Sequence, residues 1–398
     1  MDAIKNPFVP GAGTSPPELA GRETIIETAT VSIKRASLGN QSRSQMLLGL
    51  RGVGKTVLLN HLDDIAQQNQ HITSFIEANE NINLIEVLQS EIQQVLKKLS
   101  RIEAIKDKAM RGFSVLKSFL SNFNFEISGI SIEIEPELGS ADSGKLESDL
   151  SELFVILGEL AKEGKKPWTI LIDEVQYLNK TDLAAFIVAL HKCNQKNLPI
   201  LFFGAGLPQV AAMSGDAKSY AERLFSYPSI GALTEAEAAK AIKNPIEHLG
   251  ESISDKALAL IYQKTKGYPY FLQEWGSQVW DHAISGSTIS KTDVINASQQ
   301  VFDHLDHGFF SIRLDRLTNA ERDYVIAMAS LGNGPYKTPE IAAILGKKNS
   351  ALSNVRQGII NKGMIYSPTY GELHFTVPLF DDFLRRTFVQ HHFIQRII

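Results

Sequence analysis

The stretch from Gly49 to Thr56 constrains this chain more than any other. It reads Gly-Leu-Arg-Gly-Val-Gly-Lys-Thr, follows the apolar run Met46-Leu47-Leu48 and opens a helical pattern. The spacing G-x-x-x-x-G-K-[ST] between a strand and a helix is typical of a P-loop, whose backbone N–H groups wrap phosphate oxygens. Lys55 would reach the β and γ phosphates, and the Thr56 hydroxyl would ligate magnesium. The predicted nucleotide-binding residues here are Gly49, Leu50, Arg51, Gly52, Val53, Gly54, Lys55, Thr56 and Val57.

Length and charge set the outer limits. The chain has 398 residues, which suggests two or three domains. Its net charge of −4 gives no overall basic field, so any nucleic-acid contact has to come from a local patch. The first residues lack the apolar core of a signal peptide, and no apolar run approaches membrane-spanning length. We expect a cytoplasmic protein without a membrane partner. The one cysteine, Cys193, excludes an internal disulfide.

Strand and helix patterns alternate on both sides of the P-loop. A strand over 72–78 and a helix over 84–99 follow it, and a later apolar strand precedes the helix over 182–195. Such alternation predicts an α/β fold, a P-loop parallel sheet with helices on both faces. We expect a strand over 198–203 with a turn at 204–208, and a further strand over 227–233.

An insertion of about 104–145 interrupts this alternation. Its clearest part, residues 123–135, shows two alternating runs about Ser128-Gly129, which predicts a hairpin. Glu126, Glu133 and Glu135 on it would repel phosphate, so a structural ribbon or a protein contact is favoured over nucleic acid.

The strand from Trp168 ends in two carboxylates, Asp173 and Glu174. Ligands of parallel sheets bind at the carboxyl ends of strands, so Asp173 is placed to hold magnesium through water. Glu174 is placed to polarise the attacking water. A solvated acidic strand end is the alternative, and the preceding P-loop argues against it.

Two further features concern charge. Arg223 precedes a predicted strand end, where a neighbouring subunit could meet the phosphates; a surface salt bridge is the other interpretation. His304 and His307 lie one helical turn apart without a third ligand, so we do not predict a metal site there.

The last 165 residues change character to helices, beginning at a capping box at Thr234. Helical patterns over 319–330, 339–345 and 350–361 precede two short strand patterns at 364–367 and 372–377, an order typical of a winged helix-turn-helix. Residues 337–398 carry a local charge of +4. Winged helices contact duplex DNA or proteins, and the sequence leaves both open. The basic residues counted are Lys337, Lys347, Lys348, Arg356, Lys362, Arg385, Arg386 and Arg396, against Glu340, Glu372, Asp381 and Asp382.

These motifs together resemble the bacterial AAA-type ATPases related to the origin-recognition complex and to STAND-like ATPases. The resemblance covers nearly the whole chain. It rests on the segments 17–23, 49–56 and 170–174 in combination, and more weakly on Gly206-Leu-Pro208, Glu222-Arg223-Leu-Phe225, Gly267-Tyr-Pro269 and the terminal winged helix.

The resemblance implies an ATPase core, an all-α lid and a winged helix that sense ATP or ADP. Gly21 and Arg22 match the adenine-side loop, Arg223 matches the arginine finger, and Pro269 matches the STAND proline motif. Two departures favour slow switching over fast hydrolysis. Gly204 and Ala205 stand where a polar sensor residue is usual, and the Pro269 motif replaces a lid arginine.

We therefore expect an extended arm over 1–22, an ATPase core over 23–233, a lid over 234–310 and a winged helix over 311–398. The predicted function is a magnesium-dependent ATPase switch that self-assembles and acts on DNA as a loader or regulator. Lys55, Glu174 and Arg223 are its predicted catalytic residues, and Thr56 and Asp173 hold the metal. The alternative is the ATPase module of a signalling or anti-phage defence complex that grips a protein effector. A nucleotide-binding scaffold without turnover is the third interpretation.

Overall fold

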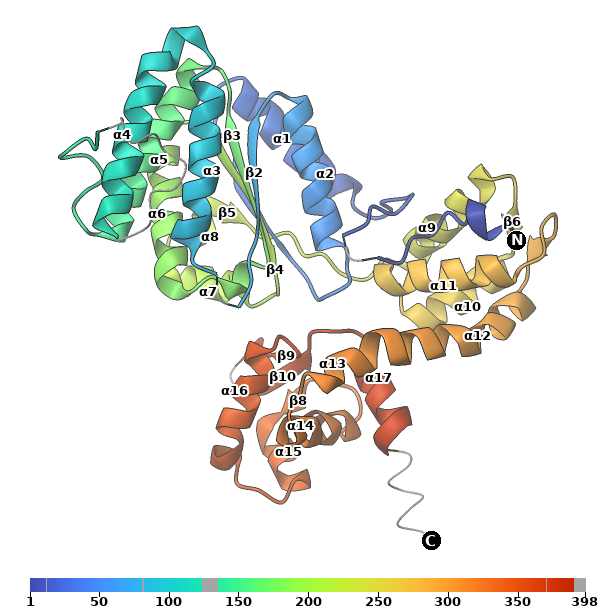
Figure 1. Cartoon of the computed structure of the whole chain (residues 1–398). Coiled ribbons are helices and arrows are strands. Elements are labelled where there is room, and N and C mark those ends of the chain that lie inside the picture. Colours follow the sequence, from blue (N-terminus) through green and yellow to red (C-terminus); the bar gives the residue numbers. More distant parts are fainter. Residues whose placement is uncertain (12, 81, 124–134, 370, 390–398) are drawn as a thin grey trace. The chain divides into compact units, whose positions relative to one another are not determined.

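The computed structural model describes residues 1–11, 13–80, 82–123, 135–369 and 371–389 (Figure 1). They divide into two compact units. The sheet unit comprises residues 23–49 and 55–229, and the helical unit comprises residues 1–22, 50–54 and 230–398. The five P-loop residues from Leu50 to Gly54 are thus counted with the helical unit. Among the described residues, no helix is both long and apolar enough to cross a membrane.

The sheet unit is built on a parallel sheet with the strand order β2-β3-β4-β1-β5. Its elements are α1 (Glu23–Ser37), β1 (Ser44–Leu48), α2 (Lys55–Gln68), β2 (Ile72–Glu77), α3 (Leu84–Leu99), η2 (Glu103–Ile105), α4 (Lys106–Asn122), α5 (Leu146–Glu163), β3 (Trp168–Asp173), η3 (Val175–Tyr177), α6 (Lys180–Gln195), β4 (Ile200–Gly206), α7 (Val210–Ala217), α8 (Ala221–Leu224) and β5 (Phe225–Ser226).

Helices cover both faces of this sheet, as the alternating pattern predicts (Figure 1). Helices α1 and α2 pack on one face; α3, α5 and α6 cover the other, and α4 packs outside α3 and α5. Strand β3 is buried along its whole length, because a central strand of a doubly covered sheet has no solvent face. The rings of Phe154 and Phe186 pack around Trp168 and Phe202 in the covered core.

The sheet unit departs from the sequence prediction in three places. Helix α4 fills part of the insertion, where no helix was predicted. Strand β4 continues through Gly206 instead of turning at Gly204. The strand predicted over 227–233 is wrong, because the ladder of β5 ends at Ser226 and Pro228 has no N–H to continue it. The predicted hairpin over 123–135 lies almost wholly outside the described residues.

The helical unit contains the remaining elements. They are η1 (Ala3–Lys5), α9 (Glu235–His248), β6 (Ser252–Ile253), α10 (Asp255–Thr265), α11 (Pro269–His282), β7 (Thr288–Ile289), α12 (Lys291–Leu305), the π-helical η4 (Asp306–Ser311), α13 (Ile312–Asp315), α14 (Asn319–Ser330), β8 (Tyr336–Lys337), α15 (Thr338–Ile344), η5 (Asn349–Leu352), α16 (Ser353–Asn361), β9 (Ile365–Tyr366), β10 (Glu372–Phe375), α17 (Phe380–Leu384) and η6 (Arg385–Val389).

Local signals explain where these helices begin. Capping boxes form at Thr234, Ser290 and Thr318, each satisfying backbone donors at a helix start. Such a cap contributes about 1 kcal/mol. Antiparallel pairing joins β10 to β8 and to β9, and the short parallel pair β6–β7 was not predicted. One continuous apolar cluster runs from α9 to α17, so the helical unit has a single core.

A buried histidine makes the sheet unit sensitive to acid. The ring of His71 bridges the hydroxyls of Ser37 and Thr169, at 2.9 and 2.7 Å. Burial lowers its pKa to about 4, against an ordinary 6.5, although a hydrogen bond with the backbone at Ile33 opposes this. The folded protein therefore binds fewer protons on this ring than the unfolded chain between these two pH values.

We predict that His71 contributes stability that is fully present above pH 6.5 and is lost as the pH falls towards 4, by on the order of 3 kcal/mol. Urea unfolding of the wild type and of His71→Gln across this range tests it, with the exposed His307→Gln as the matched control. Parallel pH profiles for the wild type and His71→Gln would contradict the assignment.

Candidate nucleotide site

The P-loop leaves the sheet at the carboxyl end of β1. The Gly49 N–H donates to the Gly206 carbonyl of β4 at 3.0 Å, so the first glycine extends the β1–β4 pairing. Gly52 and Gly54 have φ values of +78° and +91°, which only glycine adopts without strain. Lys55, the first residue of α2, is buried, and its Nζ donates to the Gly49 carbonyl at 2.9 Å. The lysine is therefore folded against the start of its own loop.

Thr56 and Asp173 lie together, as the prediction of a shared metal site requires. The Thr56 hydroxyl donates to Asp173 Oδ2 at 2.5 Å. Burial raises the pKa of the Asp173 carboxyl; the hydrogen bond from Thr56 opposes this, and the charge of Glu174 adds to it. A buried carboxylate beside a hydroxyl is a pair of hard oxygen donors, which fits a magnesium ion.

Glu174 follows Asp173 in a strained backbone conformation. Its φ and ψ are 54° and 41°, in the left-handed region that glycine favours. Its N–H donates to Asp173 Oδ1 at 2.8 Å, and this bond helps to hold the turn. Strain of this kind is found at functional sites where the surroundings fix the geometry.

Gln176 is a site residue that the sequence analysis missed. Its side-chain nitrogen donates to the Glu174 carboxylate, and its Oε1 accepts from the Leu207 N–H at 3.1 Å. The amide therefore joins the ends of β3 and β4. A glutamine two residues after a strand-end carboxylate was the only available signal. Because Gly204 and Gly206 offer no side chain at the end of β4, Gln176 supplies the polar group at this edge of the sheet.

Arg22 does not present a free guanidinium. Its Nη2 donates to the carbonyls of Gly231 and Val53, at 2.6 and 3.3 Å, and its Nη1 donates to that of Gly21 at 3.2 Å. The side chain is buried. Gly21 has φ of +70° and lies beside the Glu237 carboxylate. Arg22 therefore ties the arm to P-loop residue Val53 within the helical unit.

Pro269 places the start of α11 against the P-loop. It occupies the first turn of the helix, where its missing N–H costs no hydrogen bond. The next residue, Tyr270, donates its N–H to the Gly52 carbonyl at 3.1 Å. On the other side of the loop, the Arg51 N–H donates to the Thr376 carbonyl at 2.9 Å. Both contacts lie within the helical unit.

The remaining predicted positions are plainly placed. Leu50 lies in the loop, and Val57 follows Thr56 in the first turn of α2, half-buried. Arg223 lies in the last turn of the short helix α8, with its side chain exposed. The structure gives that side chain no ion pair among the described residues. The salt-bridge interpretation of Arg223 therefore has no support.

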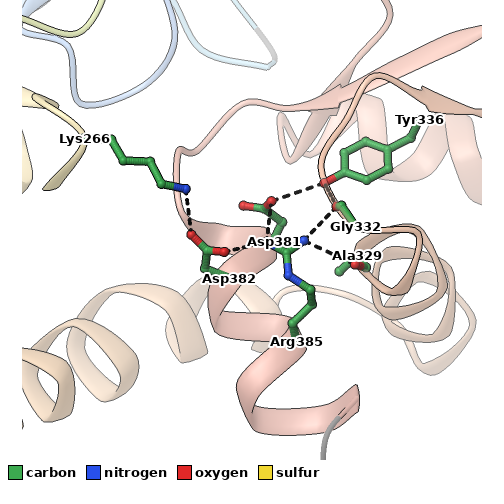
Figure 2. Close-up of polar contacts among 7 residues, drawn as sticks. All are labelled: Lys266, Ala329, Gly332, Tyr336, Asp381, Asp382 and Arg385. Carbon is green, nitrogen blue, oxygen red and sulfur yellow. Dashed lines mark hydrogen bonds and ion pairs between the residues drawn. The ribbon is translucent and has the colours of Figure 1, made fainter. Parts of the chain in front are cut away.

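Three of the eight basic residues counted near the C-terminus are paired with carboxylates of the same unit. Figure 2 shows Arg385 bound to Asp381 and Asp382, with Lys266 donating to Asp382 at 3.0 Å. Burial opposes ionisation of Asp382, but the bonds from Lys266 and Arg385 outweigh it and lower its pKa. Arg385 also donates to the carbonyls of Gly332 and Ala329. Arg386 pairs with Asp306, and Lys362 with Glu321.

Comparison with known families identifies two segments. Residues 18–203 match the family described as the AAA ATPase domain, and residues 307–384 match a domain of unknown function. No curated protein matches the sequence.

Solved structures resemble the whole chain. The Walker-type ATPase PABY2304 of Pyrococcus abyssi is 16% identical, with a TM-score of 0.56 over 94% of this chain and 97% of its own. Aeropyrum pernix ORC1, solved in complex with DNA, is 13% identical, with a TM-score of 0.47 over 96% of each chain. Thermotoga maritima RuvB is 16% identical, with a TM-score of 0.46 over 91% of this chain and 94% of its own.

The first of these likenesses shows the fold, and the AAA match covers the P-loop, Asp173 and Glu174. The site geometry agrees with both, since a P-loop lysine, a threonine hydroxyl and a buried strand-end aspartate meet at one edge of the sheet. The chain is therefore a P-loop ATPase, and its residues 18–203 match the AAA ATPase domain.

Proposed function

We propose that this ATPase is a nucleotide-dependent switch, in which the state of the P-loop is read by the helical segments that follow the sheet. Four parts divide the work: an arm over 1–22, a core over 23–233, a lid over 234–310 and a winged helix over 311–398. Self-assembly completes the site through Arg223.

The observation that carries the proposal is the hydrogen bonding of Leu50–Gly54. In this segment the Arg51 N–H donates to the carbonyl of Thr376, which follows β10. The Gly52 carbonyl accepts from the N–H of Tyr270 at the start of α11. P-loop N–H groups are the groups that wrap phosphates. A change in the loop on nucleotide binding therefore acts directly on two separate elements of the helical unit.

A stack of side chains extends this link towards α13. The rings of Tyr270 and Phe309 are stacked, with 4.6 Å between their centroids. The Arg313 guanidinium lies over the Phe309 ring, with its Cζ 3.7 Å from the ring centroid. Burial lowers the pKa of Arg313 to about 10, and the charge of Arg51 adds to this. Movement of Arg51 or Gly52 would therefore change the surroundings of Arg313 in α13, the short helix that precedes α14.

Each site residue has a distinct chemical task in this scheme. Lys55 and the loop N–H groups hold the phosphates, and Thr56 and Asp173 hold the magnesium, which neutralises charge on the phosphates. Glu174 accepts a hydrogen bond from the attacking water and orients it. Gln176 keeps the Glu174 carboxylate in place, since it binds that carboxylate and the β4 end together.

The partner we favour is duplex DNA. Helices α14, α15 and α16 followed by the β9–β10 pair have the order of a winged helix-turn-helix. Lys347, Lys348, Asn349 and Ser350 are all exposed at the start of η5, ahead of α16. Positive charge at this point suits a phosphate.

A protein effector is the second candidate, and the internal ion pairs favour it. Lys362, Arg385 and Arg386 are bound by carboxylates of the same unit, so the +4 counted from the sequence overstates the charge offered to DNA. A protein partner would need no such charge.

Separation of binding from turnover tests the proposed function. Lys55→Ala should lose nucleotide binding, because the phosphate cradle loses its cation, whereas Glu174→Gln should bind ATP and fail to turn it over. Equilibrium binding of a fluorescent ATP analogue and single-turnover hydrolysis measure the two steps. Equal loss of binding in both variants would remove Glu174 from the water-orienting role.

Arg223 should act on the site of a neighbouring copy. An arginine finger contributes on the order of 10³ to 10⁵ in rate, so Arg223→Ala should lose activity only where the wild type gains it by assembling. Hydrolysis is measured against protein concentration alongside sedimentation, and Arg35→Ala, another exposed arginine, serves as the control. Normal hydrolysis by assembled Arg223→Ala would make the residue structural.

The winged segment should bind duplex DNA weakly, and more tightly in one nucleotide state. Each neutralised phosphate adds about 0.9 to the slope of log affinity against log salt, so a few contacts predict a slope of roughly −2 to −4 from this segment. Lys347→Glu/Lys348→Glu should reduce that slope by about 2, and Lys256→Glu/Lys291→Glu is the charge-matched control. DNA binding indifferent to Lys347 and Lys348 would exclude the winged segment from DNA binding and shift the assignment of that segment to the protein effector.

A further inference from the structure

The edge of the sheet opposite the P-loop carries a second concentration of charge. Helices α1, α3, α5 and α6 end at this edge, because each is connected to a parallel strand and runs antiparallel to it. Helix α4 begins at the same edge. The turn between α3 and α4 lies at the top of Figure 1. Strand β3 has six residues, so this edge lies about 20 Å from the carboxylates of the nucleotide site.

We define the basic face by the cations in these helix ends and in the loops that join them. They are Lys34, Arg35, Lys97, Lys98, Arg101, Lys106, Lys108, Lys162, Lys165, Lys166, Lys192 and Lys196. Arg43, in the loop after α1, is left out of this set because its Nη2 donates to the Glu222 carbonyl of α8 at 2.6 Å. All are exposed except Lys166, which is half-buried. The carboxylates among them are Glu103, Asp107, Glu159 and Glu163, so the face has a net charge of +8 in a chain of net charge −4.

Contacts between the loops make the face continuous. Lys166 Nζ donates to Gln70 at 2.9 Å, and Lys162 Nζ to the Asn197 carbonyl at 3.4 Å. Lys108 pairs with Glu163 at 2.6 Å, which joins α4 to α5. The end of α1 is bound to the loop after α2, because the Ser37 hydroxyl donates to the Asn69 carbonyl at 3.4 Å. The twelve cations therefore lie on one surface.

Helix stability does not account for this charge. Lysines in the last turns of α1, α3, α5 and α6 complement the helix dipole. Lys106 and Lys108, however, lie in the first turn of α4, where the dipole disfavours a cation. Arg101 and Lys165 lie in loops. Only Lys108 and Lys196 have carboxylate partners on the face among the described residues.

We propose that the basic face binds the phosphate backbone of duplex DNA without reading its sequence. Charge complementarity is the first reason, since eight excess positive charges face a polyanion. The second is the rest of the surface, where amides such as Gln41, Gln70 and Asn197 suit phosphate oxygens. This contact is separate from the winged segment and does not depend on it.

The composition of the loops selects this partner over two others. The five loops 38–43, 69–71, 100–105, 164–167 and 196–199 contain no phenylalanine, tyrosine or tryptophan. Single-stranded nucleic acid is bound through base stacking on aromatic rings, and membrane surfaces through apolar and aromatic side chains. Leu38 is the one large apolar residue that is highly exposed in these loops.

The test is DNA binding by the full-length chain with charge reversal on the face. The variant Lys97→Glu/Lys98→Glu/Arg101→Glu/Lys106→Glu should bind a mixed-sequence 30-base-pair duplex about 10- to 100-fold more weakly than the wild type at 0.1 M salt. Its log–log salt slope should be smaller by about 2 to 4. Fluorescence anisotropy over a salt series measures both.

Two controls keep the result specific. The first control makes the same charge change on the helical unit, with the variant Lys240→Glu/Lys256→Glu/Lys264→Glu/Lys291→Glu. It should reduce the slope of log DNA affinity against log salt by less than half as much as the face variant does. Replacement of the four face residues by glutamine should give about half of the effect of glutamate, with ATP-analogue binding and thermal unfolding unchanged.

Three results would overturn the proposal. They are no duplex binding by the wild type, equal losses in the face variant and its charge-matched control, and a DNA affinity that depends only on Lys347 and Lys348. Binding of the wild type to phosphatidylserine vesicles, lost in the face variant while DNA binding is kept, would assign the face to a membrane instead. The DNA test is independent of the nucleotide test. If Lys55→Ala and Glu174→Gln failed to separate ATP binding from ATP hydrolysis, the measured DNA affinity of the basic face would be unaffected.

Discussion

The backbone of the P-loop is the constraint on which the rest of the structure depends. Its polar groups must find partners, and each partner comes from a different element: Gly206 of β4, Thr376 after β10 and Tyr270 of α11. Within the helical unit, residues Leu50–Gly54 can therefore adopt this conformation only when the segments that carry Thr376 and Tyr270 are in place. A phosphate that bound the Arg51 N–H would compete with the Thr376 carbonyl, and we propose this competition as the physical basis of the switch.

The sequence predicted those parts in which local pattern and tertiary structure agree. The bounds of α3 and α14 coincide with the predicted helices, because apolar spacing and caps both specify them. The meeting of Thr56 and Asp173 also follows from topology, since carboxyl ends of parallel strands share one edge. Helix α4 was missed because its apolar face, around Phe113 and Leu116, adjoins an alternating pattern that dominates the insertion.

The parts of the fold and of the site that the sequence did not predict depend on contacts between residues far apart in the sequence. Local sequence patterns do not indicate such contacts. Gln176 becomes a site residue only because β4 continues to Gly206 and brings the Leu207 N–H within reach. Charge behaves in the same way. Asp381 and Asp382 count against DNA binding when the sequence is read alone. In the fold they pair with Arg385, which the same count treats as free, and Asp382 also pairs with Lys266, which lies outside the counted segment. Net charge over a segment is therefore a poor measure of the charge that a partner meets.

Arg22 shows why a matched motif position does not by itself assign a role. The resemblance places it on the adenine side of the nucleotide, but its guanidinium is directed to three backbone carbonyls, one of them that of Val53. A buried arginine must satisfy five N–H donors, and carbonyl oxygens meet that need without a ligand. Its removal would leave those carbonyls unsatisfied and loosen the arm, the P-loop and the chain entering α9 together. The contacts of Arg22 therefore support a role in the shape of the loop, and they do not by themselves assign the residue to the nucleotide.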